Sequence, residues 1–423
     1  MGFREMLQGV RVVDDTISVY QEMLKRSVSL GHLPMLINNL KEAPGHRAAI
    51  NILDRRRLCD YLRVDPGELI DILAWAMENP SDPEIVPSEE APVMQNKMEV
   101  VDLTALPIPW HYPEDGGRYQ SASIIIAQYG GVRNTSFHRQ LLLDSTHTVS
   151  RFVPRHLKTM TIKANDSDDE IPISVVNGPD PMVLLAGAMS FEEPLDELRV
   201  AAALHERLYG SPLKLVELSN GVVAPADAEY AMEARITLQT EREGPYVDIT
   251  GTVDDVRLEA VIEYDAIHYR DAPVFHALIP AGREHMTLMG MPRAPTIKSA
   301  VSEVVTCTDV YLTEGGCGWL SSVVQIIPEN KGDGVKAIHA ALGGHKSMKQ
   351  VIVVDTDIDI TDSARVEWAL MTRWQPDMDT VILSNQKGSS LDPSRKQDGM
   401  TSKIGMDATI EPGTDRSPFE SVL

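Results

Sequence analysis

The spacing of hydrophobic positions changes twice along this chain. Near the N-terminus apolar side chains recur at helical spacing, as at Leu58, Leu62 and Leu73, so helices are expected there. A polar, proline-rich segment at 79–97 follows, and such segments commonly join domains. We therefore expect a mixed N-terminal α/β domain over residues 1–100.

Residues 101–300 carry short runs of β-branched and aromatic residues, broken by Gly, Pro and Asp, which are typical of strands. The runs are 121–129, 147–154, 172–176, 227–238, 259–269 and 273–280. One helix is expected to interrupt them over 191–210, because Ser190 and Glu193 form a capping-box pair before it. We expect this central domain to be a β-barrel or closed sheet with inserted helices.

From residue 301 the pattern predicts alternating strands and helices, which indicates a layered α/β domain over 301–423. The predicted strands are 321–328 and 349–360, and the predicted helices are 332–344 and 363–374. The tail from Ser384 is rich in Gly, Ser, Asp and Pro and shows little periodicity. The fold class expected for the whole chain is α/β (α+β).

The formal net charge of −23 disfavours nucleic acid as a partner, because binding phosphates requires a basic surface. No apolar run approaches the roughly 20 residues that cross a bilayer, and the charged N-terminus does not resemble a secretory signal. We expect a cytoplasmic protein without a membrane partner. Cys59, Cys307 and Cys317 lack CxxC spacing and are interpreted as reduced thiols.

The segment Arg133–His156 concentrates arginine and histidine in an otherwise acidic chain, with Asp144 as its one acid. Such a segment suits a phosphate together with a divalent ion. A basic pair of strands without any ligand would give the same composition. Sequence motifs of Rossmann dehydrogenases, P-loop enzymes, zincins and α/β-hydrolases are absent from the chain.

Four short islands carry the remaining candidate chemistry. Together they offer Asn, His and Glu side chains as metal ligands, arginines for a phosphate, and a Glu for proton transfer. The islands are 133–139, 154–157, 242–246 and 280–285.

The order and the amino-acid sequences of these islands resemble those of the UbiD family of decarboxylases. The resemblance extends over nearly the whole chain. The matching segments include GVRNTSFHR, RFVPRHL, EREGPY, HYRDAPVFHALIPAGREHMTLMG, VIVVDTDIDITD and SKIGMDATI. The resemblance implies a reversible decarboxylation of an α,β-unsaturated, aromatic or heteroaromatic acid through a covalent adduct with prenylated FMN. It also implies Mn²⁺ or Mg²⁺ and K⁺ at the flavin phosphate, a central FMN-binding split β-barrel over 101–300, and a C-terminal oligomerisation domain.

The resemblance also implies roles for individual residues. Arg139 would hold the substrate carboxylate and Glu284 would return the proton, with the pKa of Glu284 raised by burial. The metal ligands would be Asn134, His156 and Glu243. The wider set of cofactor contacts would be Asn134, Thr135, Ser136, Arg139, Arg155, His156, Ser190, Glu243 and Lys403.

Two parts of the expected site are less defined. A second acid should pair with Arg139, and the candidates are Glu259, Glu263 and Asp265. A second anionic group of the substrate could face His285 and Arg293. That would suit a furandicarboxylate-like acid or a phosphorylated unsaturated acid, whereas Arg293 could equally form a structural ion pair.

Two other interpretations stay open at this stage. One is an FMN-dependent oxidoreductase built on a split barrel, and the other is a non-catalytic subunit of a carboxylase complex. For the decarboxylase, the expected partners are a small carboxylic acid, a flavin prenyltransferase that supplies the cofactor, and further copies of the chain in a dimer or hexamer.

Overall fold

The computed structural model describes residues 2–189, 191 and 195–419. Its fold is α/β, as predicted. The chain forms two compact units, Met1–Arg63 with Ala76–Leu288 and Val64–Trp75 with Met289–Leu423. The segment predicted as a separate N-terminal domain therefore contributes to both units.

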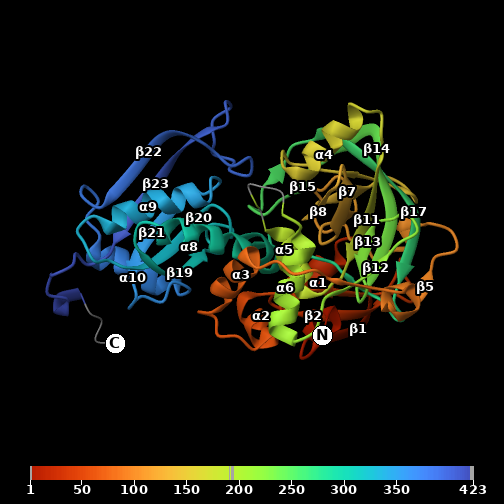
Figure 1. Cartoon of the computed structure of the whole chain (residues 1–423), viewed down its shortest axis with the longest axis horizontal. Coiled ribbons are helices and arrows are strands. Elements are labelled where there is room, and N and C mark those ends of the chain that lie inside the picture. Colours follow the sequence, from red (N-terminus) through yellow and green to blue (C-terminus); the bar gives the residue numbers. More distant parts are fainter. Residues whose placement is uncertain (1, 190, 192–194, 420–423) are drawn as a thin grey trace. The chain divides into compact units, whose positions relative to one another are not determined.

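The first unit is organised around an open sheet of nine described strands, in which the long strands β14 and β17 run antiparallel side by side (Figure 1). Strand β5 (Asn96–Lys97) pairs with β17 beside the main path. The path runs β6 (Tyr119–Gln120), β9 (Gln140–Leu142), β10 (His147–Ser150), β17 (Arg257–Tyr269), β14 (Tyr230–Glu243), β11 (Ile171–Asn177), β7 (Ile124–Tyr129), β8 (Val132–Phe137).

The expectation of a closed sheet or split barrel is wrong for the described strands, because β6 and β8 end the path without pairing with each other. The outer edge of β8 is covered by a side chain. Thr135 N donates to Glu197 Oε2 at 2.7 Å, so a carboxylate accepts the bond that a neighbouring strand would accept in a barrel.

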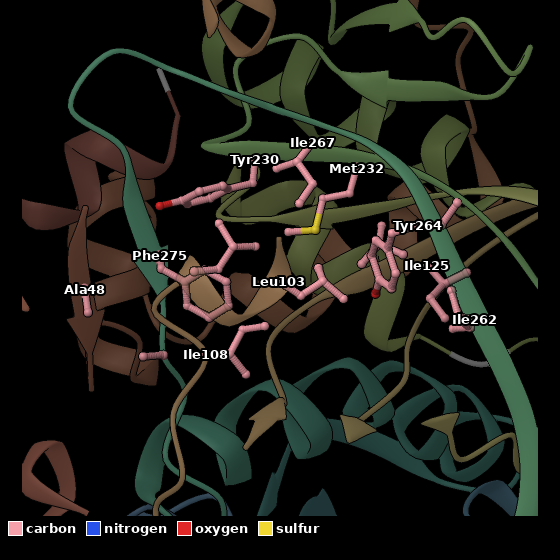
Figure 2. Close-up of a cluster of buried hydrophobic side chains, with 14 of the residues drawn as sticks. Ala48, Leu103, Ile108, Ile125, Tyr230, Met232, Ile262, Tyr264, Ile267 and Phe275 are labelled. Carbon is pink, nitrogen blue, oxygen red and sulfur yellow. The ribbon is translucent and has the colours of Figure 1, made fainter. Parts of the chain in front are cut away.

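A second sheet shows why residues 1–100 do not stand alone. It has the order β1 (Arg11–Ile17), β2 (Met35–Leu40), β3 (Arg47–Ile50), β18 (Val274–His276). Its last strand comes from the central segment and runs parallel to β3. Figure 2 shows the shared core, in which Ala48 of β3 lies in one buried cluster with Leu103, Tyr230 and Phe275.

Two small sheets and several helices complete the first unit. The sheets are β13 (Val223–Pro225), β12 (Lys214–Glu217), β4 (Glu84–Val86), and β15 (Tyr246–Val247), β16 (Val253–Asp254). The helices are η1 (Phe3–Leu7), α1 (Glu22–Ser29), α2 (Arg55–Leu62), η2 (Ser88–Glu90), η3 (Pro92–Met94), η4 (Leu103–Ala105), α4 (His156–Asn165), α5 (Pro181–Ala188), α6 (Glu197–Tyr209) and the start of α7 (Arg283–Gly290).

The helix predicted over 191–210 is confirmed as α6, whose N-cap is Asp196. The Asp196 side chain accepts a hydrogen bond from Leu198 N, as N-cap carboxylates commonly do. Ser190 and Glu193, the predicted capping box, lie outside the described residues.

The second unit contains a five-stranded sheet of order β19 (Thr306–Leu312), β20 (Ser321–Ile327), β21 (Gln350–Asp355), β23 (Met400–Ala408), β22 (Thr380–Lys387) (Figure 1). Its helices are α8 (Ala294–Ser302), α9 (Asp333–Gly344) and α10 (Ser363–Arg373), with η5 (Met291–Arg293), η6 (Ser417–Phe419) and most of α3 (Leu69–Glu78). The predicted strands and helices over 321–374 are confirmed.

The tail from Ser384, whose sequence shows little periodicity, nevertheless forms regular structure. It contains β23, which lies between β21 and β22 in the sheet. Met406 and Ala408 of β23 are buried, but Gly405 and Lys403 beside them hide the apolar pattern in the sequence. Within the described residues, no helix has both the length and the apolar character of a membrane-spanning segment.

Candidate active site

Arg139 lies between β8 and β9 and is surrounded by carboxylates. Its Nε and Nη2 donate to Glu243 at 2.9 Å each, Nη1 donates to Asp248 at 2.5 Å, and Nη2 also donates to Asp254 at 2.9 Å. The guanidinium carbon lies 4.5 Å from the ring centroid of Tyr246. A guanidinium has five N–H donors, so these contacts leave one N–H of Nη1 for a ligand.

The EREGPY motif explains how these acids reach Arg139. Glu243 ends β14, and the chain then turns sharply at Gly244, whose φ of +101° favours glycine. A Cβ atom on Gly116 would lie 2.6 Å from Gly244 O, so the two loops approach closely because neither carries a side chain there. The turn leads into the β15–β16 hairpin, with Asp248 between its strands and Asp254 in β16.

Electrostatics at Arg139 reflect both burial and charge. Burial alone would lower the pKa of Arg139, but its hydrogen bond to Glu243 and the charges of the three acids raise it overall. Asp115, which accepts a bond from Val247 N at 2.8 Å, is buried, and burial raises its pKa to about 6. Arg139 is thus a permanent cation within an acid-rich cluster of the first unit.

The three acids that the sequence suggested as partners of Arg139 lie elsewhere, so this expectation is corrected. Glu259 contacts Arg151 and Lys158, whereas Glu263 and Asp265 both contact Arg235. All three lie on β17. The acids that do contact Arg139 come from β14 and the β15–β16 hairpin, which no local pattern places beside residue 139.

A second polar group lies on β8. Asn134 Nδ2 donates to Glu197 Oε1 at 2.8 Å, and Asn134 Oδ1 accepts from Ser136 Oγ at 2.8 Å. Glu197 is buried, and burial raises its pKa to about 8. An amide and a carboxylate in contact are suitable oxygen ligands for a divalent cation, so Glu197 is a candidate ligand that the sequence interpretation missed.

Glu243 does not join this group, since both of its oxygens accept bonds from Arg139. His156 begins α4 with Arg155 as the N-cap residue. The described residues contain no cluster of three or more His, Cys, Asp and Glu arranged to hold a metal. An Asn134–Glu197 pair supplies only one residue of those types, so this result does not exclude it.

Side chains on β8, and one that follows this strand, add to the polar cluster around Asn134. Ser136 Oγ contacts His138 Nε2 at 2.9 Å, and burial lowers the pKa of His138 to about 4, so its ring is neutral near pH 7. Thr135 Oγ1 is buried and has no hydrogen-bond partner among the described residues. An unsatisfied buried hydroxyl is uncommon in proteins and fits a position that contacts a bound polar group.

Glu284 occupies a different environment from the one expected of a proton donor. Its Oε2 accepts from Asn51 N at 3.0 Å, and its Oε1 accepts from Leu53 N at 3.1 Å and contacts His276 Nε2 at 3.0 Å. The side chain is 1% exposed. Both oxygens are therefore used to hold residues 51–53 against the first turn of α7.

His285 follows Glu284 on α7 and lies within electrostatic range of Asp248 and Arg139. Burial lowers its pKa, and the charge of Arg139 lowers it further, against the raising effect of Asp248. Its Nδ1 accepts a hydrogen bond from Ala281 N at 3.2 Å, so the neutral ring carries its proton on Nε2. This geometry keeps His285 as a candidate for contact with a ligand at Arg139.

The other predicted site residues lie in the second unit or outside the described residues. Arg293 is buried, with its guanidinium carbon 5.4 Å from the Trp319 ring centroid. Lys403 Nζ donates to Lys346 O at 2.6 Å, and burial lowers its pKa. Ser190 lies outside the described residues.

Comparisons with known proteins identify the family of the chain. Residues 84–283 match the UbiD family, described as 3-octaprenyl-4-hydroxybenzoate carboxy-lyase Rift-related domain, and residues 286–408 match the corresponding C-terminal domain. The anhydromevalonate phosphate decarboxylase of Methanosarcina mazei is 40% identical over 380 residues, covering 89% of this chain and 87% of that protein. The enzyme of the same name from Methanocaldococcus jannaschii is 38% identical and covers 90% of each chain.

Among solved structures, the UbiD-class enzyme HmfF from Pelotomaculum thermopropionicum in complex with FMN superimposes with a TM-score of 0.95 at 32% identity. The match covers 100% of this chain and 97% of HmfF. With both family domains matched and these relatives aligned over most of their length, the chain belongs to the UbiD family and is a carboxy-lyase.

Proposed function

We propose that the protein decarboxylates an α,β-unsaturated acid that carries a phosphate group, similar to the substrate named in anhydromevalonate phosphate decarboxylase. The carrying observation is Arg139, a cation whose side chain is 9% exposed and which, among the described residues, has one N–H donor left for a carboxylate. The five relatives of that name, at 35–40% identity, favour a phosphorylated acid over a furandicarboxylate-like acid.

The proposed cofactor is prenylated FMN, which a solved form of HmfF contains. When bound, this flavin would act as the electron sink that accepts the electrons left by CO₂. The unsatisfied hydroxyl of Thr135 and the polar side chains of β8 fit a bound polar cofactor, with Ser136, Arg155, Ser190 and Lys403 as further proposed contacts.

The proposed metal is Mn²⁺ or Mg²⁺, with K⁺ nearby. Its proposed ligands are Asn134, His156 and Glu197, in place of the earlier set with Glu243. Asn134 and Glu197 are already in contact, whereas Glu243 is committed to Arg139. A cation would also neutralise the carboxylate of Glu197, which is costly to bury as an anion.

In the proposed mechanism, Arg139 holds the substrate carboxylate, and an acid returns a proton after CO₂ leaves. Asp248 is better placed for this role than Glu284. It contacts Arg139 at 2.5 Å and its side chain is 16% exposed, whereas both oxygens of Glu284 are bound by residues 51–53 and His276. His285 and Arg293 remain candidates for the second anionic group.

Partners follow from the same proposal. A flavin prenyltransferase would supply the cofactor, and the chain would assemble as a homo-oligomer, either dimer or hexamer, in the cytoplasm. The family assignment leaves no support for the oxidoreductase or for the non-catalytic subunit, since the named relatives are decarboxylases.

The test is CO₂ release by protein co-expressed with a flavin prenyltransferase and supplied with Mn²⁺. Anhydromevalonate phosphate should be turned over, while the same acid without its phosphate should be a much poorer substrate. Furandicarboxylate serves as the competing substrate. Turnover of furandicarboxylate alone would replace the proposed substrate class, and release of CO₂ from none of the three acids would contradict the proposal.

A further inference from the structure

The short strand β15 brings two side chains to Arg139. The Tyr246 ring lies over the guanidinium, and the Asp248 carboxylate, one residue beyond the strand, accepts a hydrogen bond from it. Strand β15 consists of two residues and pairs with the equally short β16. A hairpin of this kind is marginally stable at best without other support. The geometry around Arg139 therefore depends on what holds the other edge of β15.

Asp115 occupies that edge in place of a neighbouring strand. Its Oδ1 accepts from Val247 N at 2.8 Å, and its side chain is 5% exposed. Val247 lies between Tyr246 and Asp248, so this bond fixes the piece of backbone from which both contacts with Arg139 extend. The acids that pair with Arg139 in the described contacts are others. The Asp115 carboxylate holds backbone instead.

The second oxygen of Asp115 connects the hairpin with the chain before α7. Asp115 Oδ2 accepts from Tyr112 N at 3.2 Å, and Tyr112 OH donates to Pro280 O at 2.8 Å. Burial raises the pKa of Tyr112 to about 12, so its hydroxyl keeps the proton that this bond requires. Helix α7 carries His285, which lies within electrostatic range of Arg139. One carboxylate thus links two segments that contribute residues around Arg139.

Other residues of the same loop hold the turn that precedes β15. Gly116 N donates to Pro245 O at 2.8 Å, and Tyr246 OH donates to Ser121 Oγ at 2.9 Å. These bonds fix the start of the hairpin. The bond from Asp115 lies further along the chain, directly before Asp248.

We propose that Asp115 is a positioning residue for the decarboxylation, which holds the Val247 backbone so that Tyr246 and Asp248 keep their places around Arg139. This inference rests on the proposed function, in which Arg139 holds the substrate carboxylate and Asp248 returns the proton. A displacement of about 1 Å at a reacting group can lower a rate by about 10²-fold. A bond that fixes the hairpin therefore affects kcat although Asp115 itself touches no ligand.

Protonation of Asp115 should weaken this support. Burial raises its pKa to about 6, against the lowering effects of the two backbone N–H groups and the charge of Arg139. A protonated carboxyl carries an O–H donor, so it accepts less well from two N–H groups at once. Asparagine resembles this neutral form, because its amide has one acceptor oxygen and one donor nitrogen. The charged and titratable groups around Asp115 are Glu114, Tyr112, Arg139 and Tyr246.

The experiment measures CO₂ release from anhydromevalonate phosphate by enzyme loaded with prenylated FMN and Mn²⁺. At about pH 8, Asp115→Asn should lower kcat by about 10- to 100-fold. KM should change by less than about threefold, because Arg139 keeps both of its bonds to Glu243. Asp180→Asn is the matched control, since Asp180 is also buried and accepts from a backbone N–H, that of Met182 at 2.7 Å. Thermal melts establish that each variant is folded.

Two further measurements distinguish positioning from a purely structural role. The ratio of the wild-type kcat to that of Asp115→Asn should fall toward unity as the pH is lowered through about 6, because the protonated wild type then resembles the variant. In an Asp248→Asn background, Asp115→Asn should lower the single-turnover rate by less than about threefold, because the residue through which Asp115 acts is already lost.

A kcat ratio that does not change with pH would overturn the role of Asp115. The same holds for a double variant whose loss equals the product of the two single losses, and for an equal loss of kcat in Asp180→Asn. Absence of CO₂ release by the wild type would instead overturn the proposed function, and this inference with it.

Discussion

Two clusters of charged residues in the first unit differ in how their hydrogen-bonding capacity is used. At Arg139, three carboxylates surround one guanidinium and one N–H donor stays available. At Glu284, two backbone N–H groups and the His276 imidazole occupy both carboxylate oxygens. The first cluster keeps a donor for a ligand, whereas both carboxylate oxygens of the second already have partners in the protein.

The difference shows that the place of an acid within a sequence motif does not by itself reveal its role. Glu284 and Asp248 are both acidic residues of the first unit near His285. What separates them is the backbone around them. Residues 51–53 turn their N–H groups toward Glu284, while Asp248 sits in a hairpin turn whose backbone uses only its other oxygen, through Ile249 N.

The largest loss of activity is expected when Arg139 is substituted. Arg139→Ala should lower kcat/KM by at least about 10³-fold, because it removes the carboxylate anchor and leaves three acids facing each other. CO₂ release and the flavin absorption spectrum should be measured on the same preparation. Arg133→Ala is the matched control, since Arg133 lies on β8 and pairs with Asp196, the N-cap residue of α6, and not with the acids around Arg139. Comparable loss in both variants would remove the distinction between Arg139 and its basic neighbours.

Substitutions of Asp248 and Glu284 should differ in their effects on kcat and on stability. Asp248→Asn should lower kcat by about 10²- to 10³-fold, as expected for loss of a general acid, with little change in melting temperature. Glu284→Gln should instead lower the free energy of unfolding by about 1–3 kcal/mol, because a backbone N–H loses its acceptor, and should change kcat much less. Thermal melts and single-turnover rates distinguish the outcomes. A larger kcat loss in Glu284→Gln would return the proton-donor role to Glu284.

The sequence identified some of these residues and missed others for definite reasons. The motif that contains Asn134 and Arg139 is contiguous, so its resemblance to the family was visible. Glu197 lies 63 residues from Asn134, and Asp254 lies 115 residues from Arg139. No periodicity connects such positions. The signal for Asp248 was its place two residues beyond the quoted EREGPY motif, in the turn between β15 and β16.

Contacts between residues far apart in the sequence also limited the prediction of the fold. Local patterns predicted the helices α6, α9 and α10 and the longer central strands β7, β11, β14 and β17. They did not predict that β18 would join the N-terminal sheet, or that β23 would sit inside the C-terminal sheet. Strand order is determined by which apolar faces pack together, and those contacts join residues far apart in the sequence.

A smaller effect is expected at Asp115, beside the Arg139 cluster. Burial raises its pKa from 3.8 to about 6, so the folded protein binds more protons there than the unfolded chain does between these two values. Its contribution to stability is present below pH 3.8 and is lost as pH rises to about 6, by roughly 3 kcal/mol at 1.36 kcal/mol per unit. Asp115→Asn should remove this loss. Urea unfolding of both proteins at pH 4 and pH 7 tests it, and identical pH dependence would show that Asp115 does not titrate in this way.

The smallest effect is expected for Tyr119→Phe, which keeps the ring against Tyr246 and removes the hydroxyl that donates to Glu243 Oε1 at 3.1 Å. One neutral donor to a carboxylate contributes about 1.5–3 kcal/mol at most, and Arg139 still holds both oxygens of Glu243. We therefore expect kcat/KM to fall by no more than about tenfold, the lower end of that range. Tyr246→Phe, which loses the bond to Ser121 Oγ at 2.9 Å, is the matched control. If Tyr119→Phe lowered kcat/KM as strongly as Arg139→Ala, Tyr119 would belong with Arg139 in the reactive cluster rather than among the residues that position Glu243.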